Sequence, residues 1–92
     1  MEFEFEVGAT EPHRVRFRTS KANGKVTIFV DGVSVKQEKF RFWIPVHRRY
    51  ELRVGDSEMH EVAIEVAFAR LARKLIKPTC TAYVDGEVVG TY

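Results

Sequence analysis

The chain has 92 residues, 45% of them hydrophobic, and its net charge of +2 results from 15 basic and 13 acidic side chains. This composition is typical of one small globular domain and not of a disordered chain, and no apolar run reaches the roughly 20 residues that span a bilayer. The single cysteine, Cys80, has no second cysteine to pair with, and the chain starts without a signal peptide, so we expect a cytoplasmic protein.

The first half of the chain predicts four strands. Residues 2–7 alternate between apolar side chains and glutamates, and residues 14–18 alternate between apolar side chains and arginines. An antiparallel pair would set the acidic outer row of one strand beside the basic outer row of the next. Residues 26–30 predict a third strand, and Asp31–Gly32 predicts a two-residue hairpin turn that leads into a fourth strand over 33–42.

Two stretches of this half recur in the second half in the same order. The segment FEFEVGATEPHRV (3–15) is matched 47 residues later by YELRVGDSEMHEV (50–62), with six of thirteen positions identical. Chance would give about one identity. The segment VTIFVDGVSV (26–35) is matched 54 residues later by CTAYVDGEVV (80–89). We therefore predict a single domain, residues 1–92, built as an internal duplication with pseudo-two-fold symmetry, unit one at about 1–45 and unit two at about 46–92.

The second unit predicts strands at about 47–54, 60–68, 79–85 and 87–91. The segment EVAIEVAFARLARKLI (61–76) also fits a helix, because its large apolar residues share one helical face and a proline follows. The repeat favours a strand to about residue 68 and then an irregular insertion at 69–78, which the first unit lacks. A helix near 61–76, and with it an α+β fold, is the alternative.

Eight short strands with hairpin turns predict an all-β fold, an eight-stranded antiparallel β-sandwich. The inward positions of the alternating segments give the expected core: Phe3, Phe5, Val15, Phe17, Ile28, Val30, Leu52, Val54, Val62, Ile64 and Val84.

The strand and turn segments resemble those of the Fas apoptotic inhibitory molecule family, in the order and at the spacing of that family. The segments that carry the resemblance are HRVRF (13–17), GKVTIFVDG (24–32), FRFW (40–43), YELRVG (50–55) and YVDGEVV (83–89). The resemblance implies an all-β sandwich and a non-enzymatic protein that acts through protein contacts in cell-survival signalling. Familiar members carry two such domains, whereas this chain is long enough for one, and the insertion at 69–78 also departs from the family pattern.

Two Glu-x-His pairs are the first candidates for chemistry. Glu11 with His13, and Glu58 with His60, lie two residues apart, so each pair would share one face of a strand. A metal site needs three or four converging ligands, and no further ligand can be nominated. We expect polar residues at strand entrances, copied by the duplication, and predict no catalytic residue, metal or cofactor. Cys80 occupies the position of Val26 in the first unit, which favours a small buried residue over a nucleophile.

Two groups of residues are candidates for partner contact. Phe29 and Tyr83 are matched aromatic residues on the outer face, where they either raise strand propensity or mark a protein-binding surface. The insertion combines large aliphatic with basic side chains, which either cap one end of the sandwich or dock on an acidic-rimmed partner or a second copy of the chain. Its residues are Leu71, Leu75, Ile76, Arg70, Arg73 and Lys74.

These patterns lead to two functional hypotheses. The first is a non-enzymatic protein that acts by protein–protein interaction, with an unknown partner or a weak homodimer and without membrane contact. The alternative is binding of nucleic acid or another anion through surface arginines and lysines. Acidic residues are interspersed among the basic ones, so nucleic acid is the less favoured partner.

Overall fold

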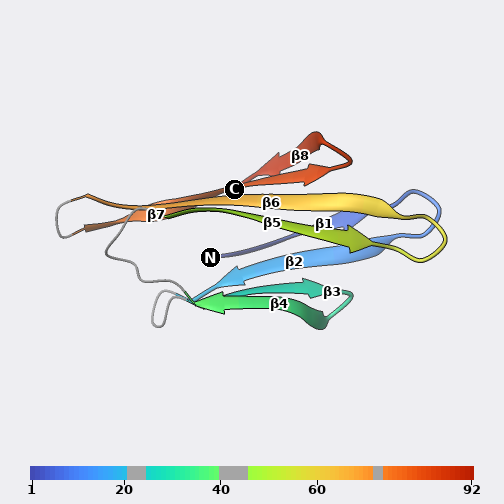
Figure 1. The fold of residues 1–92 in the computed structure, drawn as a ribbon, viewed down its shortest axis with the longest axis horizontal. Coiled ribbons are helices and arrows are strands. Elements are labelled where there is room, and N and C mark those ends of the chain that lie inside the picture. Colours follow the sequence, from blue (N-terminus) through green and yellow to red (C-terminus); the bar gives the residue numbers. More distant parts are fainter. Residues whose placement is uncertain (21–24, 40–45, 72–73) are drawn as a thin grey trace. The chain divides into compact units, whose positions relative to one another are not determined.

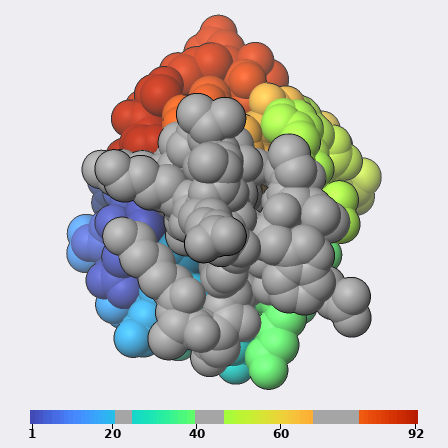
Figure 2. Space-filling view, turned by 90° about the vertical axis from the view of Figure 1, so that its left-hand side faces the viewer, coloured from blue at the N-terminus to red at the C-terminus, as the bar shows by residue number. Residues whose placement is uncertain are grey.

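The computed structural model describes residues 1–20, 25–39, 46–71 and 74–92, and the ribbon of Figure 1 is coloured over these ranges. The side chains of residues 46, 68–71 and 74–78 are not described, and Figure 2 draws the undescribed residues in grey. Within the described ranges the chain is all-β, with eight strands in two four-stranded sheets. This confirms the predicted fold class.

The first sheet has the strand order β1-β2-β3-β4. Its strands are β1 (Glu2–Val7), β2 (His13–Thr19), β3 (Lys25–Val30) and β4 (Val33–Lys39), and each pairs antiparallel with the next. The period-two pattern directs phenylalanine and aliphatic side chains to one face, where they are buried, and charged side chains to the other. The strands therefore form where alternation predicts them, in the order in which they follow along the chain.

The second sheet has the order β5-β6-β7-β8, with β5 (Val46–Val54), β6 (His60–Leu71), β7 (Lys74–Val84) and β8 (Glu87–Thr91). Here the prediction of an irregular insertion at 69–78 is wrong, and so is the alternative helix near 61–76. The β6–β7 ladder continues past Ala67 to the pair Leu71↔Lys74, interrupted only by a register shift. Cross-strand hydrogen bonds thus outweigh the helical propensity of the alanine-rich stretch.

Local backbone geometry repeats between the two sheets. Asp31 and Asp85 both have φ 51°, and the glycines that follow them have φ 81° and 83°, as type I′ hairpin turns require. The following strand carries a bulge at the same place in both sheets: Val35 and Val89 are left out of register. The correspondence between the two sequence repeats therefore extends from residue identities to turns and bulges.

The buried residues also correspond between the repeats. The pairs Val15/Val62 and Phe17/Ile64 are at most 1% exposed, and so is the pair Val26/Cys80, which the expected core did not include. Four residues of the expected core are only partly buried, namely Phe5, Leu52, Val30 and Val84. The last two directly precede the hairpin turns, where the sheet ends and fewer side chains cover a residue. Alternation thus predicted which face of the sheet these residues occupy, but not how deeply each side chain is buried.

Contacts divide the chain into two compact units. The first comprises Met1–Phe40 with Val54–His60, and the second comprises Arg41–Arg53 with Glu61–Tyr92. The loop after β5 therefore belongs to the same unit as the first sheet. No helix in the described ranges is long and apolar enough to cross a membrane.

Candidate functional site

The glutamates of the two Glu-x-His pairs lie in two loops of the first unit, residues 8–12 and 55–59, and the histidines are the first residues of β2 and β6. The Glu58 carboxylate accepts backbone hydrogen bonds from Ala9 (2.7 Å), Thr10 (2.9 Å) and Glu11 (3.2 Å), and one from the Thr10 hydroxyl. These donors, together with His60, hold the pKa of Glu58 far below its usual value, the Thr10 hydroxyl having the largest effect. The carboxylate therefore serves as the anchor of the opposite loop.

The Glu11 carboxylate makes the reciprocal set of bonds. It accepts the backbone N–H groups of Asp56 (2.8 Å), Ser57 (3.0 Å) and Glu58 (3.0 Å), and the Ser57 hydroxyl (2.6 Å). Its pKa is likewise held far below the usual value, first by the Ser57 hydroxyl and then by His13. Each backbone or hydroxyl donor to Glu11 lies 47 residues after the equivalent donor to Glu58, so the two loops exchange carboxylates symmetrically.

His13 lies between two carboxylates. Its Nε2 is 2.9 Å from Glu11 and its Nδ1 is 2.5 Å from Asp31, which raises its pKa, with the Asp31 bond as the largest cause. In the second repeat, His60 Nε2 is 2.7 Å from Glu58. A carboxylate beside each ring nitrogen favours the protonated imidazolium form of His13, which can donate from both nitrogens.

These residues therefore hold the loops together. The carboxylate oxygens are occupied by N–H and O–H donors, and no group of three or more His, Cys, Asp and Glu in the described residues is placed to hold a metal ion. Cys80 is fully buried, and burial raises its pKa to about 11, which keeps the thiol protonated and unreactive at neutral pH. The interpretation of Cys80 as a buried small residue is confirmed.

The outer face of the first sheet carries an acidic row on β1 and a basic row on β2. Arg16 lies 2.8 Å and Arg18 3.7 Å from Glu2, and Arg14 lies 3.6 Å from Glu4. The three arginines that the anion-binding hypothesis placed on this face are therefore paired with carboxylates of the neighbouring strand. Nothing in this arrangement favours anion binding.

The outer face of the second sheet repeats these rows with the charges reversed. Arg49 and Arg53 on β5 occupy the positions of Glu2 and Glu6, while Glu61 and Glu65 on β6 occupy those of Arg14 and Arg18. Arg49 lies 2.5 Å from Glu65, and Arg53 lies 3.9 Å from Glu61. Cross-strand ion pairs are thus kept, with the signs exchanged.

The matched aromatic residues lie on these outer faces, partly exposed. The guanidinium carbon of Arg16 is 5.8 Å from the centroid of the Phe29 ring, and that of Arg49 is 5.3 Å from the centroid of the Tyr83 ring. The Tyr83 hydroxyl also reaches Glu65 at 3.5 Å. Each ring is therefore already in cation–π contact with an arginine of its own sheet.

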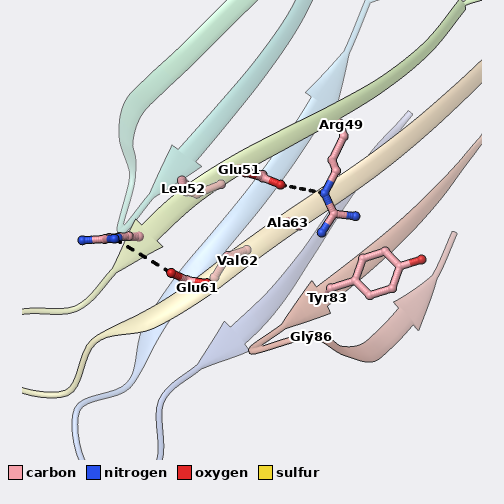
Figure 3. Close-up of a pocket in the computed structure, with 9 residues that line it drawn as sticks. Arg49, Glu51, Leu52, Glu61, Val62, Ala63, Tyr83 and Gly86 are labelled. Atoms are coloured by element: carbon pink, nitrogen blue, oxygen red, sulfur yellow. Dashed lines mark hydrogen bonds and ion pairs between the residues drawn. The ribbon is translucent and has the colours of Figure 1, made fainter.

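A hollow of about 440 Å³ adjoins Tyr83 on the second sheet (Figure 3). In the close-up, Arg49 and Tyr83 lie at one side, and Glu51, which is bonded to Arg49 at 2.9 Å, comes from β5. The lining residues all belong to the second unit and lie on β5, β6 or the β7–β8 hairpin. Four of them are charged. The full set is Arg49, Glu51, Leu52, Arg53, Glu61, Val62, Ala63, Tyr83 and Gly86.

The other predicted contact residues do not join this site in the described structure. Residues 70, 71 and 74–76 lie on β6 and β7, but their side chains are outside the description, and residue 73 is outside it altogether. The proposed patch or cap of Leu71, Leu75, Ile76, Arg70, Arg73 and Lys74 therefore stays a prediction. Of the two predicted contact residues whose side chains are described, Phe29 and Tyr83, Tyr83 lines the hollow.

The sequence analysis did not predict that the residues around Tyr83 form a hollow, although the charges of the two repeats differ there. Comparison of the repeats by identity hides the fact that Glu2 and Glu6 become Arg49 and Arg53. Comparison by charge exposes this exchange, and also shows that Arg16 of the first repeat is replaced by Ala63.

No family model matches the chain, and no curated protein matches it in sequence. The resemblance to the Fas apoptotic inhibitory molecule family therefore rests on the strand and turn segments quoted above. What that resemblance implies about function stays a prediction.

Proposed function

We propose that the protein is a small non-enzymatic β module that acts by protein–protein contact, and that its contact surface is the outer face of the second sheet around Tyr83. The observation that carries this proposal is the hollow of about 440 Å³ on the second sheet, which is lined by Tyr83, Leu52 and four charged side chains. An aromatic ring beside a partly polar hollow is a common anchor point in protein interfaces.

A non-enzymatic role is supported by the use of the chemically capable residues. The Glu11 and Glu58 carboxylates are engaged by backbone N–H groups, the His13 and His60 rings are bonded to these carboxylates, and Cys80 is buried. The resemblance to the Fas apoptotic inhibitory molecule family points to the same class of function. We propose contact with another protein within the cytoplasm.

Photo-crosslinking from the two matched aromatic positions tests this proposal. p-Benzoylphenylalanine is placed at Tyr83 or at Phe29 in the full chain, and irradiation is carried out in the native cell. We expect one discrete protein, identified by mass spectrometry, to be captured from position 83 and not from position 29. A product of twice the chain mass would identify the partner as a second copy.

A second variant tests whether the captured protein binds at the hollow. Ala63→Arg restores on the second sheet the side chain that covers the ring on the first, and it should abolish capture from position 83. Capture that is equal from both positions, or that survives Ala63→Arg, would show that this face is not the contact surface.

A further inference from the structure

The outer face of the first sheet carries another hollow, of about 380 Å³, which we call the basic hollow. Six of its seven described lining residues have N–H or O–H donors in their side chains, and they come from β2, β3, β4 or the residue that follows β2. These six are Arg18, Ser20, Lys25, Thr27, Ser34 and Gln37.

The charge of the basic hollow is not balanced by its own wall. Two of the described lining residues, Arg18 and Lys25, are cations, and none of the described lining residues is acidic. The 13 acidic residues of the chain all lie in the described ranges, so the remaining segments have no carboxylate to add. An anion in the basic hollow would therefore be attracted by two cations without repulsion from the wall.

Arg18 can donate to a ligand although it lies opposite Glu2 in the ladder. Its Nε is 3.7 Å from the Glu2 carboxylate, beyond hydrogen-bond distance, whereas Arg16 lies 2.8 Å from the same carboxylate. One carboxylate is thus shared by two arginines, with the closer contact to Arg16. The Arg18 side chain is 62% exposed, so its guanidinium is accessible to a further acceptor.

Lys25 lies opposite another cation. Its partner in the β3–β4 ladder is Lys39, and both belong to the set of residues that faces outward from the sheet. Like charges directly opposite each other destabilise an antiparallel pair. An anion beside Lys25 would offset this repulsion, which favours an anionic over a neutral ligand.

Neutral donors complete the wall of the basic hollow. The Ser20 backbone N–H donates to the Lys25 carbonyl at 2.9 Å, which holds these two residues next to each other. The Gln37 side-chain amide donates to the Ser34 hydroxyl oxygen at 3.1 Å, so the Ser34 hydroxyl proton can be donated to a ligand. Thr27 on β3 adds a further hydroxyl.

The second repeat replaces both cations of the basic hollow and two of its hydroxyls. The residues at the equivalent positions are Glu65 for Arg18, Thr79 for Lys25, Ala67 for Ser20 and Val88 for Ser34. The second sheet nevertheless has the same strand order, hairpin turn and bulge. The donor set is therefore a property of the first sheet that the shared fold does not require.

We infer that the basic hollow binds a phosphate dianion, the group that inorganic phosphate and phosphate monoesters share, through Arg18, Lys25 and the neutral donors around them. A phosphate monoester carries about two negative charges at neutral pH and three acceptor oxygens. Two cations with several donors match this group better than they match a carboxylate. The site lies on the first sheet, so the inference goes beyond the proposed contact surface around Tyr83 and does not depend on it.

Amide chemical-shift titration of the isotope-labelled full chain tests this inference. The probe is acetyl-Gly-phosphoserine-Gly-amide, the controls carry serine or glutamate in place of phosphoserine, and sodium chloride at matched ionic strength controls for screening. We expect saturable shifts among residues 18–20, 25–29 and 34–37 with the phosphopeptide and none with the serine peptide. The glutamate peptide should bind about tenfold more weakly or worse, because one charged contact is lost.

Inorganic phosphate as a second probe distinguishes the source of the group. A phosphopeptide that binds more tightly than inorganic phosphate would identify a phosphorylated protein segment as the ligand. Equal or tighter binding of inorganic phosphate would identify free phosphate. Either result supports the site.

Matched variants assign the binding to the basic hollow. Lys25→Thr introduces the residue of the second repeat, and Arg18→Gln removes the other cation, so each should weaken binding by about tenfold or more. Lys36→Thr is the control for the lysine, because Lys36 lies opposite the buried Ile28 and so belongs to the other face. Arg14→Gln is the control for the arginine, and both controls should keep the affinity of the parent.

An absence of saturable shifts with both phosphate probes would overturn the inference, and so would equal affinity for the glutamate peptide. Losses in the two control variants as large as those at positions 18 and 25 would show a response to net charge alone, which also refutes the site. The comparison of peptides uses the parent chain and is therefore decisive whether or not each variant folds.

Discussion

Ionisable side chains in the paired loops make stability depend on pH in two directions. The pKa of His13 is raised from about 6.5, so its contribution is complete below that pH and is lost as the pH rises through the raised value. The pKa values of Glu11 and Glu58 are lowered from 4.5, so their contribution is complete above that pH and is lost as the pH falls. The melting temperature should therefore be highest between these two limits.

Replacement of His13 tests the alkaline side of this profile. His13→Gln should shrink the loss of melting temperature above pH 6.5, because the group with the raised pKa is gone. Thermal unfolding followed by circular dichroism across the pH range measures the effect. If His13→Gln lost melting temperature above pH 6.5 as the parent does, the hydrogen bonds from His13 to Asp31 and Glu11 would add no stability.

Cys80 and Val26 occupy equivalent buried positions and should accept each other's side chains. Cys80→Val and Val26→Cys should each change the free energy of unfolding by less than about 1.5 kcal/mol, as volume-conserving changes do. Cys80→Ser should cost about 1–3 kcal/mol, because a hydroxyl replaces a thiol at a fully buried site. Chemical denaturation measures these values. A Cys80 thiol that reacts rapidly with a disulfide reagent in the folded protein would contradict its burial.

At the level of elements, two glycines set the shape of the paired loops. Gly8 has φ 103° and Gly55 has φ 115°, a region closed to other residues, and a Cβ at either position would collide with the carbonyl oxygen of Glu11 or Glu58. These carbonyls belong to the residues whose carboxylates bind the opposite loop. The glycines therefore permit the turn that aims each carboxylate.

A comparison of glycine positions tests this requirement. Gly32, in the β3–β4 turn, also has positive φ, but a Cβ there would meet open space, so Gly32→Ala should cost only the backbone term of about 1–2 kcal/mol. Gly8→Ala and Gly55→Ala should lose more, because the collision adds to that term. Urea denaturation of the three variants gives the order. Equal losses at all three positions would show that the close approach in the loops carries no cost.

The long β6–β7 hairpin is the element that local pattern did not predict. Its sequence fits a helical face and a strand equally well, and the first repeat offers no template for residues 69–78. The ladder that extends to Leu71↔Lys74 depends on hydrogen bonds between two separate segments, which no periodicity within one segment encodes.

On the scale of the whole molecule, the carboxylate exchange ties together loops 45 to 49 residues apart in sequence. Glu11 and Glu58 accept equivalent sets of hydrogen bonds in the same loop–loop contact. Glu11→Gln and Glu58→Gln should therefore lower the melting temperature by similar amounts. The double variant should lose less than the sum, since either change alone already weakens the shared loop contact. Glu4→Gln, an exposed ion-pair residue, is the control and should have little effect.

Differential scanning calorimetry of the four variants measures the coupling. Additive losses in the double variant would mean that the two carboxylates act independently, and the loops would then be two separate contacts. Strongly unequal losses would show that the symmetry of the hydrogen bonds does not extend to their energy.

The sequence by itself determined the strands outside the long β6–β7 hairpin, the hairpin turns at Asp31 and Asp85, and the repeat, because alternation and turn chemistry are local properties of a few adjacent residues. Only the tertiary structure decided that Glu11 and Glu58 bind each other's loops, that Val30 and Val84 are partly exposed, and that a hollow adjoins Tyr83. These features depend on which distant segments meet, and on how many neighbours cover each side chain. Neither is encoded in a local pattern.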